Sequence, residues 1–366
     1  MWNKLTFTAL AISFLMLFAF SSCEEDENNN EQQNILPAKF KVDIPESLST
    51  SENQKTSYED EPSGDEIYQH LRNFIAVGEE SAKIVEEIMI AIGTYGLDQE
   101  MDIIYDGDDG REKHLVVVTD VTFEQKSFEY QLTVTDLESE GGEDGGKAMQ
   151  VFWNNNPVDG VAILYPYNID RMNDAELQYA MYRIDYSETG DSGYEEEMTV
   201  YISNYPMLSP DVDPYSMNNL KMFAGKDGDN IDVYGNSNHP NAQFFNEETG
   251  FNWAFSASSN EITNFAVAEV GLPPNTLDAA DRAILLDTFS IKNVFTDQIY
   301  DEYPNADSAT VARYLANTTP PGFFNTNGFV VGGEAPTGAY DNLLLRIEEL
   351  TPFNPSMINE LTISFK

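Results

Sequence analysis

Residues 128–135, with the sequence FEYQLTVT, contain the pattern that decides the fold class. The apolar and aromatic side chains, from Phe128 to Val134, fall on one side of an extended chain, and the Glu, Gln and Thr side chains between them fall on the other. A period of two is typical of an antiparallel strand with one buried and one solvated face. The segment therefore predicts a half-buried strand.

The neighbouring sequence repeats this pattern, with Gly, Asp and Asn turns between the segments. Further candidate strands are residues 101–105, 113–121, 148–153, 161–165, 179–186, 198–203, 220–224, 231–234, 251–255 and 263–270. Short connections favour an antiparallel meander, because a parallel crossover needs about a dozen residues or more. A sheet of about eleven strands has to curl, so we expect a half-barrel, with a closed barrel or a two-sheet sandwich as alternatives.

A long amphipathic helix is predicted before these strands, in residues 63–93. Apolar residues recur there at steps of three and four, which is the period of a helix with one buried face. Ser63 and Glu66 have the spacing of a capping box, and Gly93 is a natural end. So broad an apolar stripe has to pack on a large surface, and we expect it to fill the concave face of the sheet. The predicted fold class is α+β.

The sequence predicts that residues 276–366 form a helical, loop-rich lobe, which belongs to the same domain as residues 63–275. Helices are expected at residues 276–300, 308–315 and 340–350, a loop-rich stretch at 318–340 and a closing strand at 361–365. Asp307 or Ser308 is the expected cap of the second helix. The lobe is predicted to pack on the sheet or to form its rim.

The composition excludes several classes of function. The chain of 366 residues has 63 Asp and Glu against 19 Lys and Arg, a formal net charge of -44. Such a chain repels a phosphate backbone, so nucleic-acid binding is not expected. One cysteine and three histidines cannot supply an internal disulfide, a cysteine-rich zinc site or an iron–sulfur cluster. Gly-x-Ser-x-Gly, His-Glu-x-x-His and P-loop motifs are absent from the sequence, and the histidines are interpreted as packed or exposed residues.

The first 22 residues are typical of an export signal. A positively charged start and an apolar run over residues 5–20 precede Cys23, the only cysteine of the sequence. This arrangement resembles a bacterial lipoprotein box, with Phe20 in place of the usual Leu. The acidic residues 24–27 are similar to the export tag of surface lipoproteins in the Bacteroidota. The resemblance implies that Cys23 carries lipid and anchors the protein in the outer membrane, at the cell surface; an ordinary secretory signal with an incidental cysteine is the alternative.

A lipidated, flexible tether is predicted for residues 23–62. Residues 24–34 and 45–63 are mainly polar and bury too little apolar area to offset the cost of ordering. Residues 40–44 alternate like a short strand and would attach the tether to the body once. The order of lipid anchor, tether, helix and antiparallel sheet resembles that of half-barrel lipoprotein carriers in layout alone.

An acid-rich turn contains the candidate metal ligands Asp106, Asp108 and Asp109. Calcium prefers oxygen ligands of this kind, and it is the only metal ion that we consider as a cofactor. The turn does not match an EF-hand loop, because Gly110 stands at the fifth position. Asp-Gly pairs are also the preferred residues of tight hairpins, so a turn without metal is the alternative.

Aromatic residues are the candidates for ligand binding, because their rings offer broad, rigid stacking faces. The candidates are Trp153, Tyr165, Tyr167 and Tyr201, with Tyr182 and Tyr186 as further members of the same groove. Trp153 precedes an Asn/Pro turn and is expected to be the most exposed of them. Packing in the core is the alternative.

A short modification pattern occurs near the C-terminus, where Asp307-Ser308-Ala309 resembles the acceptor of O-glycosylation in the Bacteroidota, with Ser308 as the modified residue. Together these features predict a non-catalytic lipoprotein that binds a partner protein or an apolar or glycan ligand at the cell envelope. One alternative is a secreted-type glycan hydrolase, which needs two carboxyl groups about 5 to 10 Å apart. The other is an accessory subunit of a surface uptake or secretion complex, which predicts an exposed apolar patch on one rim.

Overall fold

The computed structural model describes residues 35–37, 39–50, 65–93, 100–171, 175–209, 213, 215–242 and 250–366. Two compact units are present within them. Unit 1 consists of the described parts of Met1–Lys41, Glu80–Gly190 and Ile363–Lys366, and unit 2 of those of Val42–Glu79 and Asp191–Thr362. The predicted export signal and Cys23 lie outside the described residues.

Unit 1 contains the first six strands of the described chain, and each pairs with its sequence neighbours in antiparallel fashion. They are β1 (Met101–Asp106), β2 (Glu112–Phe123), β3 (Lys126–Asp136), β4 (Lys147–Asn155), β5 (Val158–Leu164) and β6 (Met181–Ser187). Three short helical turns connect strands of this unit: η1 (Leu137–Ser139), α3 (Pro166–Ile169) and η2 (Ala175–Tyr179). The register of β2 against β3 places Lys113 opposite Asp136, at the end of the pair where the polar network described below is found.

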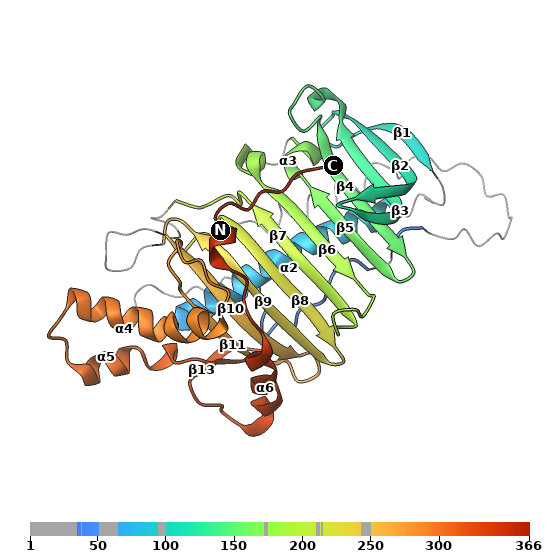
Figure 1. Ribbon diagram of the computed structural model, residues 1–366. Coiled ribbons are helices and arrows are strands. Elements are labelled where there is room, and N and C mark those ends of the chain that lie inside the picture. Colours follow the sequence, from blue (N-terminus) through green and yellow to red (C-terminus); the bar gives the residue numbers. More distant parts are fainter. Residues whose placement is uncertain are drawn as a thin grey trace. The chain divides into compact units, whose positions relative to one another are not determined.

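Unit 2 contains seven further strands among its described residues, again antiparallel in sequence order. They are β7 (Glu196–Ser203), β8 (Asn219–Asp227), β9 (Asn230–His239), β10 (Phe251–Asn260), β11 (Phe265–Gly271), β12 (Gly322–Asn325) and β13 (Gly328–Gly332). Over the described residues the strands make a thirteen-stranded antiparallel sheet in the order β1 to β13 (Figure 1). This order confirms the predicted meander. The sheet is not closed, because β1 and β13 are its ends, so the closed-barrel alternative is wrong.

Helix α2 (Asp65–Gly93) occupies the segment in which the apolar periodicity predicts a helix, and the predicted cap Ser63 lies outside the described residues. Its first half, up to Glu79, belongs to unit 2. Gly78 lets this half approach β8 closely, since a Cβ there would come within 2.5 Å of the Met222 side chain. In the described part of the chain, no helix combines the length and the apolar character needed to cross a membrane.

The C-terminal part of the chain differs from the prediction in three places. Residues 318–340 contain the short strands β12 and β13, whose apolar pairs between glycines are too brief to show a period of two. The helical run over 276–300 consists of a π-helical turn, η3 (Ala283–Thr288), and α4 (Ile291–Glu302). Residues 361–365, predicted as a strand, have no regular structure. Helix α5 (Ser308–Tyr314) is capped by the Asp307 carboxylate as predicted, and α6 (Asp341–Glu349) matches the last predicted helix.

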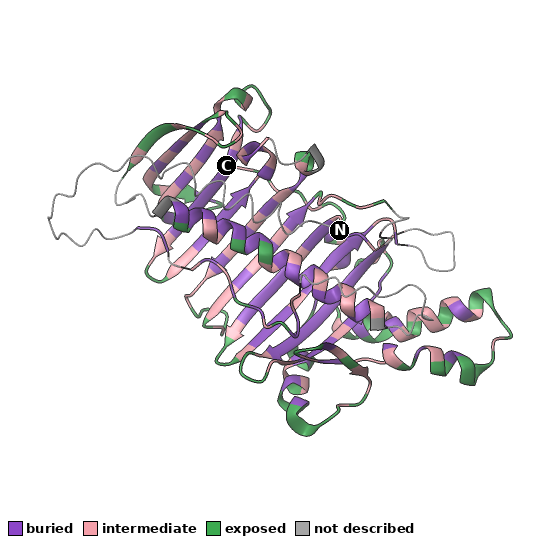
Figure 2. Cartoon of the chain, turned by 180° about the vertical axis from the view of Figure 1, so that it is seen from behind, coloured by how far each residue is buried: buried purple, intermediate pink, exposed green. Residues whose placement is uncertain are grey.

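The two faces of the unit 2 strands are covered by different segments. Helix α6 and the turn η6 (Pro355–Ile358) lie against strands β8 to β11. On the opposite face of β9 and β10, the Phe74 ring of α2 packs on Trp253 with ring centroids 5.1 Å apart. Figure 2 shows that most of each of these strands is buried. An antiparallel sheet can leave one face in water, but here both faces are covered.

Residues 35–50 correct the predicted tether. Ile35, Leu36, Phe40, Val42, Ile44 and Leu48 are all buried. The segment is not a strand; side chains accept the hydrogen bonds of its backbone amides instead. Glu86 Oε1 accepts from Phe40 N at 2.9 Å within unit 1, and Glu79 Oε1 accepts from Ile44 N at 3.1 Å within unit 2. The predicted attachment at residues 40–44 is confirmed, although it is not a strand, whereas the prediction of a flexible, solvated tether is wrong for this stretch, because its apolar side chains are buried.

Candidate functional site

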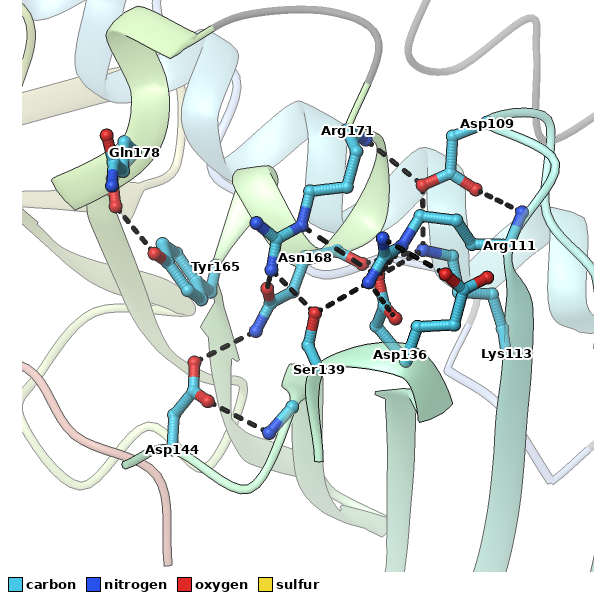
Figure 3. A network of polar contacts seen from close by, with 12 residues as sticks. Asp109, Arg111, Lys113, Asp136, Ser139, Asp144, Tyr165, Asn168, Arg171 and Gln178 are labelled. Carbon is cyan, nitrogen blue, oxygen red and sulfur yellow. Dashed lines mark hydrogen bonds and ion pairs between the residues drawn. The ribbon is translucent and has the colours of Figure 1, made fainter. Parts of the chain in front are cut away.

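A dense polar network lies in unit 1 where β2 begins and β3 ends (Figure 3). The tight turn before β2 closes with hydrogen bonds from Gly107 N to the Arg111 carbonyl at 2.7 Å and from Gly110 N to the Gly107 carbonyl at 2.8 Å. Gly110 has φ 72, a left-handed conformation that glycine adopts without strain. The turn thereby brings Asp109 next to Lys113, whose Nζ lies 2.9 Å from Asp109 Oδ2.

Asp136, the last residue of β3, is the acceptor at the centre of the network. Arg111 binds it with both Nε (2.7 Å) and Nη2 (2.9 Å), and Lys113 Nζ donates to it at 3.0 Å. The side chain of Asp136 has 0% exposure. Burial alone would raise the pKa of Asp136, but the hydrogen bonds from Arg111 and Lys113 outweigh burial and hold this pKa below its usual value. Asp136 is therefore a permanent anion that fixes both cations.

Two guanidinium groups converge on the hydroxyl of Ser139, which comes from η1. Arg171 Nη2 donates to Ser139 Oγ at 2.6 Å, and Arg111 Nη2 donates to the same atom at 2.8 Å. Arg171 Nη2 also donates to Asn168 Oδ1 at 2.6 Å. The buried Nε of Arg171 has no hydrogen-bond partner among the described residues. Two oriented guanidinium groups therefore donate to the uncharged Ser139 Oγ.

Two aromatic rings lie next to these donors, on and beside α3. The guanidinium carbon of Arg171 lies 3.9 Å from the centroid of the Tyr167 ring, a cation–π contact. The rings of Tyr165 and Tyr167 have centroids 6.2 Å apart, and the Tyr165 hydroxyl donates to the Gln178 carbonyl at 2.5 Å. Both tyrosines are half-buried. Ring faces and guanidinium donors are thus available side by side.

The structure brings three of the predicted site residues, Asp109, Tyr165 and Tyr167, into this network. Asp109 is a partner of cations: its carboxylate accepts from Lys113 Nζ, from Arg111 N at 3.1 Å and from Arg171 N at 3.1 Å. Asp106 and Asp108 are exposed. Among the described residues no group of three or more His, Cys, Asp and Glu side chains is placed to hold a metal ion. The calcium hypothesis thus gains no support from this turn.

Trp153 corrects the prediction of an exposed aromatic. Its side chain is 0% exposed, and its Nε1 donates to the Ile35 carbonyl at 2.7 Å. The ring also stacks on Tyr130, with centroids 5.3 Å apart. The sequence could not show this, because the residue that covers Trp153 is 118 positions away.

The remaining predicted residues lie elsewhere. Tyr182 and Tyr186 are buried, at 1% exposure each. Tyr201 belongs to unit 2, where the Lys221 ammonium lies 5.3 Å from its ring centroid. Ser308 is exposed at the first residue of α5, and Asp307 before it caps the helix through Thr310 N at 2.9 Å. Ser308 is therefore accessible in the described structure, and its glycosylation stays a prediction.

Sequence reasoning missed the cations of the network. Arg111, Lys113 and Arg171 come from a chain with only 19 Lys and Arg. The available signal was the pair at positions 111 and 113, two residues apart at the start of a strand and directly after an acid-rich turn. Side chains two apart on a strand share a face, so both cations had to meet the same acidic partners.

A second constellation, in unit 2, joins two of the three histidines to a serine. His239 is 0% exposed; its Nδ1 donates to the Tyr215 carbonyl at 2.7 Å, so its Nε2 accepts from Ser237 Oγ at 2.7 Å. The His70 ring packs against Tyr215 in a tilted arrangement, with centroids 4.9 Å apart. Burial lowers the pKa of His239 to about 3, against the opposing effect of the Tyr215 hydrogen bond. Ser237 is also 0% exposed, which makes this serine–histidine contact part of the core.

The pH dependence of stability tests this interpretation of His239. Because its folded pKa of about 3 lies below the ordinary value of 6.5, the unfolded chain takes up a proton first as the pH falls. The wild type should therefore lose stability between pH 6.5 and pH 4, by up to about 1.4 kcal/mol per pH unit from this group. In urea denaturation, the stability advantage of wild type over His239→Gln should shrink as the pH falls. An advantage that does not change with pH would contradict the interpretation.

No family model, curated protein sequence or solved structure matches this chain. What the unit 1 network can do is therefore argued from its own chemistry. Guanidinium groups in a fixed orientation bind carboxylate and similar oxyanions through two hydrogen bonds at once. The Ser139 hydroxyl occupies the position where an oxygen of such an anion would accept from Arg111 and Arg171.

Proposed function

We propose that this protein is a non-catalytic lipoprotein, anchored in the outer membrane through Cys23, that binds a carboxylate-bearing glycan at the cell surface. The observation that supports the ligand is the convergence of Arg111 Nη2 and Arg171 Nη2 on Ser139 Oγ, beside the Tyr165 and Tyr167 rings. In this proposal the antiparallel sheet is a half-barrel whose concave face holds α2. It carries the site but takes no part in chemistry.

The chemistry of the site favours an acidic sugar over a neutral or apolar ligand. A uronic acid offers a carboxylate for the guanidinium donors and a ring face for a tyrosine, so one residue of the ligand uses both features. A carboxylate acceptor adds an opposite charge and a second oxygen for a bidentate contact with a guanidinium group, and the neutral Ser139 hydroxyl offers neither. In this proposal a ligand carboxylate therefore displaces the Ser139 hydroxyl as the acceptor of the Arg171 hydrogen bond.

Binding without hydrolysis follows from the state of the buried carboxylates. A glycosidase needs one carboxyl group that keeps its proton near neutral pH, which requires a raised pKa. Asp136 has a lowered pKa because Arg111 and Lys113 bind it, and both oxygens of Asp109 accept hydrogen bonds. These two groups are therefore unsuited to be the general acid, which argues against the glycan-hydrolase alternative at this site.

Removing the Arg171 guanidinium should weaken ligand binding. We expect Arg171→Gln to bind an oligogalacturonate about 10- to 150-fold more weakly than wild type in calorimetry, because one charge-assisted contact worth about 1.5–3 kcal/mol is lost. Arg313→Gln is the matched control: it removes the same charge from an exposed position on α5 and should bind as wild type does. Equal losses in both variants, or no binding by the wild type, would refute the glycan ligand.

The anchor part of the proposal has a geometric consequence. Because Trp153 holds the Ile35 carbonyl, only about twelve residues separate Cys23 from the packed chain of unit 1. At 3.3–3.6 Å per residue they reach about 40 Å at most. A lipid on Cys23 would therefore keep unit 1 within about 40 Å of the membrane surface.

Lipid attachment is tested on Cys23 itself. We expect the wild type to incorporate a palmitate analogue and to sediment with outer membranes, because acyl chains contribute about 0.8 kcal/mol per buried CH₂. Cys23→Ala should lose the label and appear in the soluble fraction. Trp153→Phe should stay labelled. It removes the hydrogen bond to the Ile35 carbonyl, which lengthens the free segment after Cys23, but it leaves the acceptor thiol unchanged. An unlabelled wild type, or Cys23→Ala retained in the membrane, would disprove the anchor.

One observation favours the accessory-subunit alternative. Strand β1 ends the sheet among the described residues, and its Ile103 and Ile104 are 38% and 60% exposed. An edge strand with exposed apolar side chains is a template for strand addition by another chain. Acidic neighbours such as Asp102 disfavour pairing with a second copy of this chain.

This alternative predicts that binding of the partner protein depends on Ile104. If a partner adds a strand to β1, Ile104→Asp should remove a protein that co-purifies with the wild type from native membranes, by placing a charge in the interface. Val330→Asp, at a 42% exposed position on the other terminal strand β13, is the matched control and should retain it. Loss of the companion in both variants, or no companion of the wild type, would rule out the β1 interface.

A further inference from the structure

One face of β8, β9 and β10 carries polar side chains in rows, and we call it the asparagine face. The register aligns Asn219 with Asn238 and Asn238 with Asn252, so that each of the three strands contributes one asparagine to the first row. The second row contains Lys221, Asn236 and Ala254. The third contains Phe223, Tyr234 and Ser256, and the fourth Gly225, Asp232 and Ser258.

The chain's own C-terminal segment runs along these rows. Arg346 binds Asp232 in the fourth row, with Nη2 2.7 Å from Oδ2. Phe353 packs on Tyr234 of the third row, with centroids 5.3 Å apart, and its ring centroid lies 3.9 Å from the Lys221 ammonium of the second. The segment then passes over the asparagines of the first row.

The asparagine face binds the backbone of the segment as well as its side chains, among which Asn359 Oδ1 accepts from Asn238 Nδ2 at 2.9 Å. Asn219 Nδ2 donates to the Ile358 carbonyl at 2.9 Å, and Asn252 Nδ2 donates to the Pro355 carbonyl at 2.8 Å. Ser256 Oγ donates to the Leu350 carbonyl at 3.4 Å. Every peptide has such carbonyl groups, so these three contacts do not depend on the side chains of the occupant.

The second row is where the chain's own segment fits worst. Asn236 is 0% exposed, and neither its Nδ2 nor its Oδ1 has a hydrogen-bond partner in the described part of the chain. The residues that cross this row lie between Leu350 and Pro355, and they include Pro352, which has no N–H. A buried amide group without hydrogen-bond partners destabilises the arrangement that buries it.

We propose that the asparagine face is a binding site for an extended peptide segment of a partner protein, and that residues 350–359 occupy it in cis. The proposal is independent of the glycan site in unit 1. The partner peptide has a residue other than proline at the position of Pro352, so that its N–H binds Asn236 Oδ1 and a neighbouring carbonyl binds Asn236 Nδ2. The cis segment then acts as an internal competitor that keeps the face covered until such a peptide is present.

A synthetic peptide with the sequence of residues 348–361 tests the face directly, because it is the occupant that the structure shows. Fluorescence anisotropy would measure its binding to the full chain carrying Phe353→Ala, which loosens the cis segment. We expect at least tenfold tighter binding to this variant than to the wild type. Adding Asn252→Ala should weaken the binding again, since one carbonyl contact is lost. Equal affinity of the wild type and Phe353→Ala, or no binding to either, would overturn the proposal.

A second binding measurement tests whether the peptide residue at position 352 contacts Asn236. A peptide in which alanine replaces Pro352 should bind the Phe353→Ala chain about three- to tenfold more tightly than the native peptide, because its new N–H reaches Asn236. The gain should disappear when the protein also carries Asn236→Leu. A gain that persists with Asn236→Leu would show that proline acts through backbone conformation, and would overturn the assignment of Asn236.

The same coupling can be measured inside one chain if Phe353→Ala does not fold. Pro352→Ala, Asn236→Leu and the double variant of the full chain form a double-mutant cycle in thermal or urea unfolding. We expect Pro352→Ala to be more favourable with Asn236 present than with Leu at this position, by about three- to tenfold in the folding equilibrium. Additive effects would mean that the segment does not meet Asn236, and would overturn the proposal.

Discussion

Buried carboxylates paired with arginine are the interaction on which both units depend. The pairs are Asp136 with Arg111 in unit 1 and Asp232 with Arg346 in unit 2. Removing one partner of such a pair leaves an uncompensated charge, at a cost of about 3–5 kcal/mol. A chain with 19 Lys and Arg against 63 Asp and Glu uses several of its cations in this way, so its surface stays acidic.

The segments that cover the sheet without regular structure are held by a common device. Residues 35–50 place backbone amides on carboxylates of α2, as Phe40 N does on Glu86, and residues 350–359 place backbone carbonyls on side-chain amides such as Asn252. Irregular backbone can be buried only if its polar groups are bound, and here side chains replace the partner strand. Such segments can be exchanged more readily than a strand in the sheet, because fewer hydrogen bonds hold them.

The strands and their order could be predicted from the sequence, whereas the covering of their faces could not. A period of two is local, and FEYQLTVT shows it without knowledge of its neighbours. The polar positions 232, 234, 236 and 238 of β9 show the same alternation and would indicate a solvated face, yet a segment more than a hundred residues later covers them. The burial of Trp153 and the part that Arg171 takes in the network were missed for the same reason. Their partners Ile35 and Ser139 are distant in sequence, and nothing local indicates either contact.

An acidic protein can bind an anion only where oriented donors outweigh the charge of the whole chain. Interactions between exposed charges are largely screened beyond about 8 Å at physiological ionic strength, so most of the net charge of -44 is not felt at a site this small. What remains local is a set of three cations, Arg111, Lys113 and Arg171, around the two buried carboxylates of Asp109 and Asp136. Glu138 Oε2 also lies 3.4 Å from Arg111 Nη1, so three carboxylates balance the three cations and hold the guanidinium groups in place. An anion would therefore bind through the orientation of the donors and not through an excess of positive charge, and affinity should change little with ionic strength.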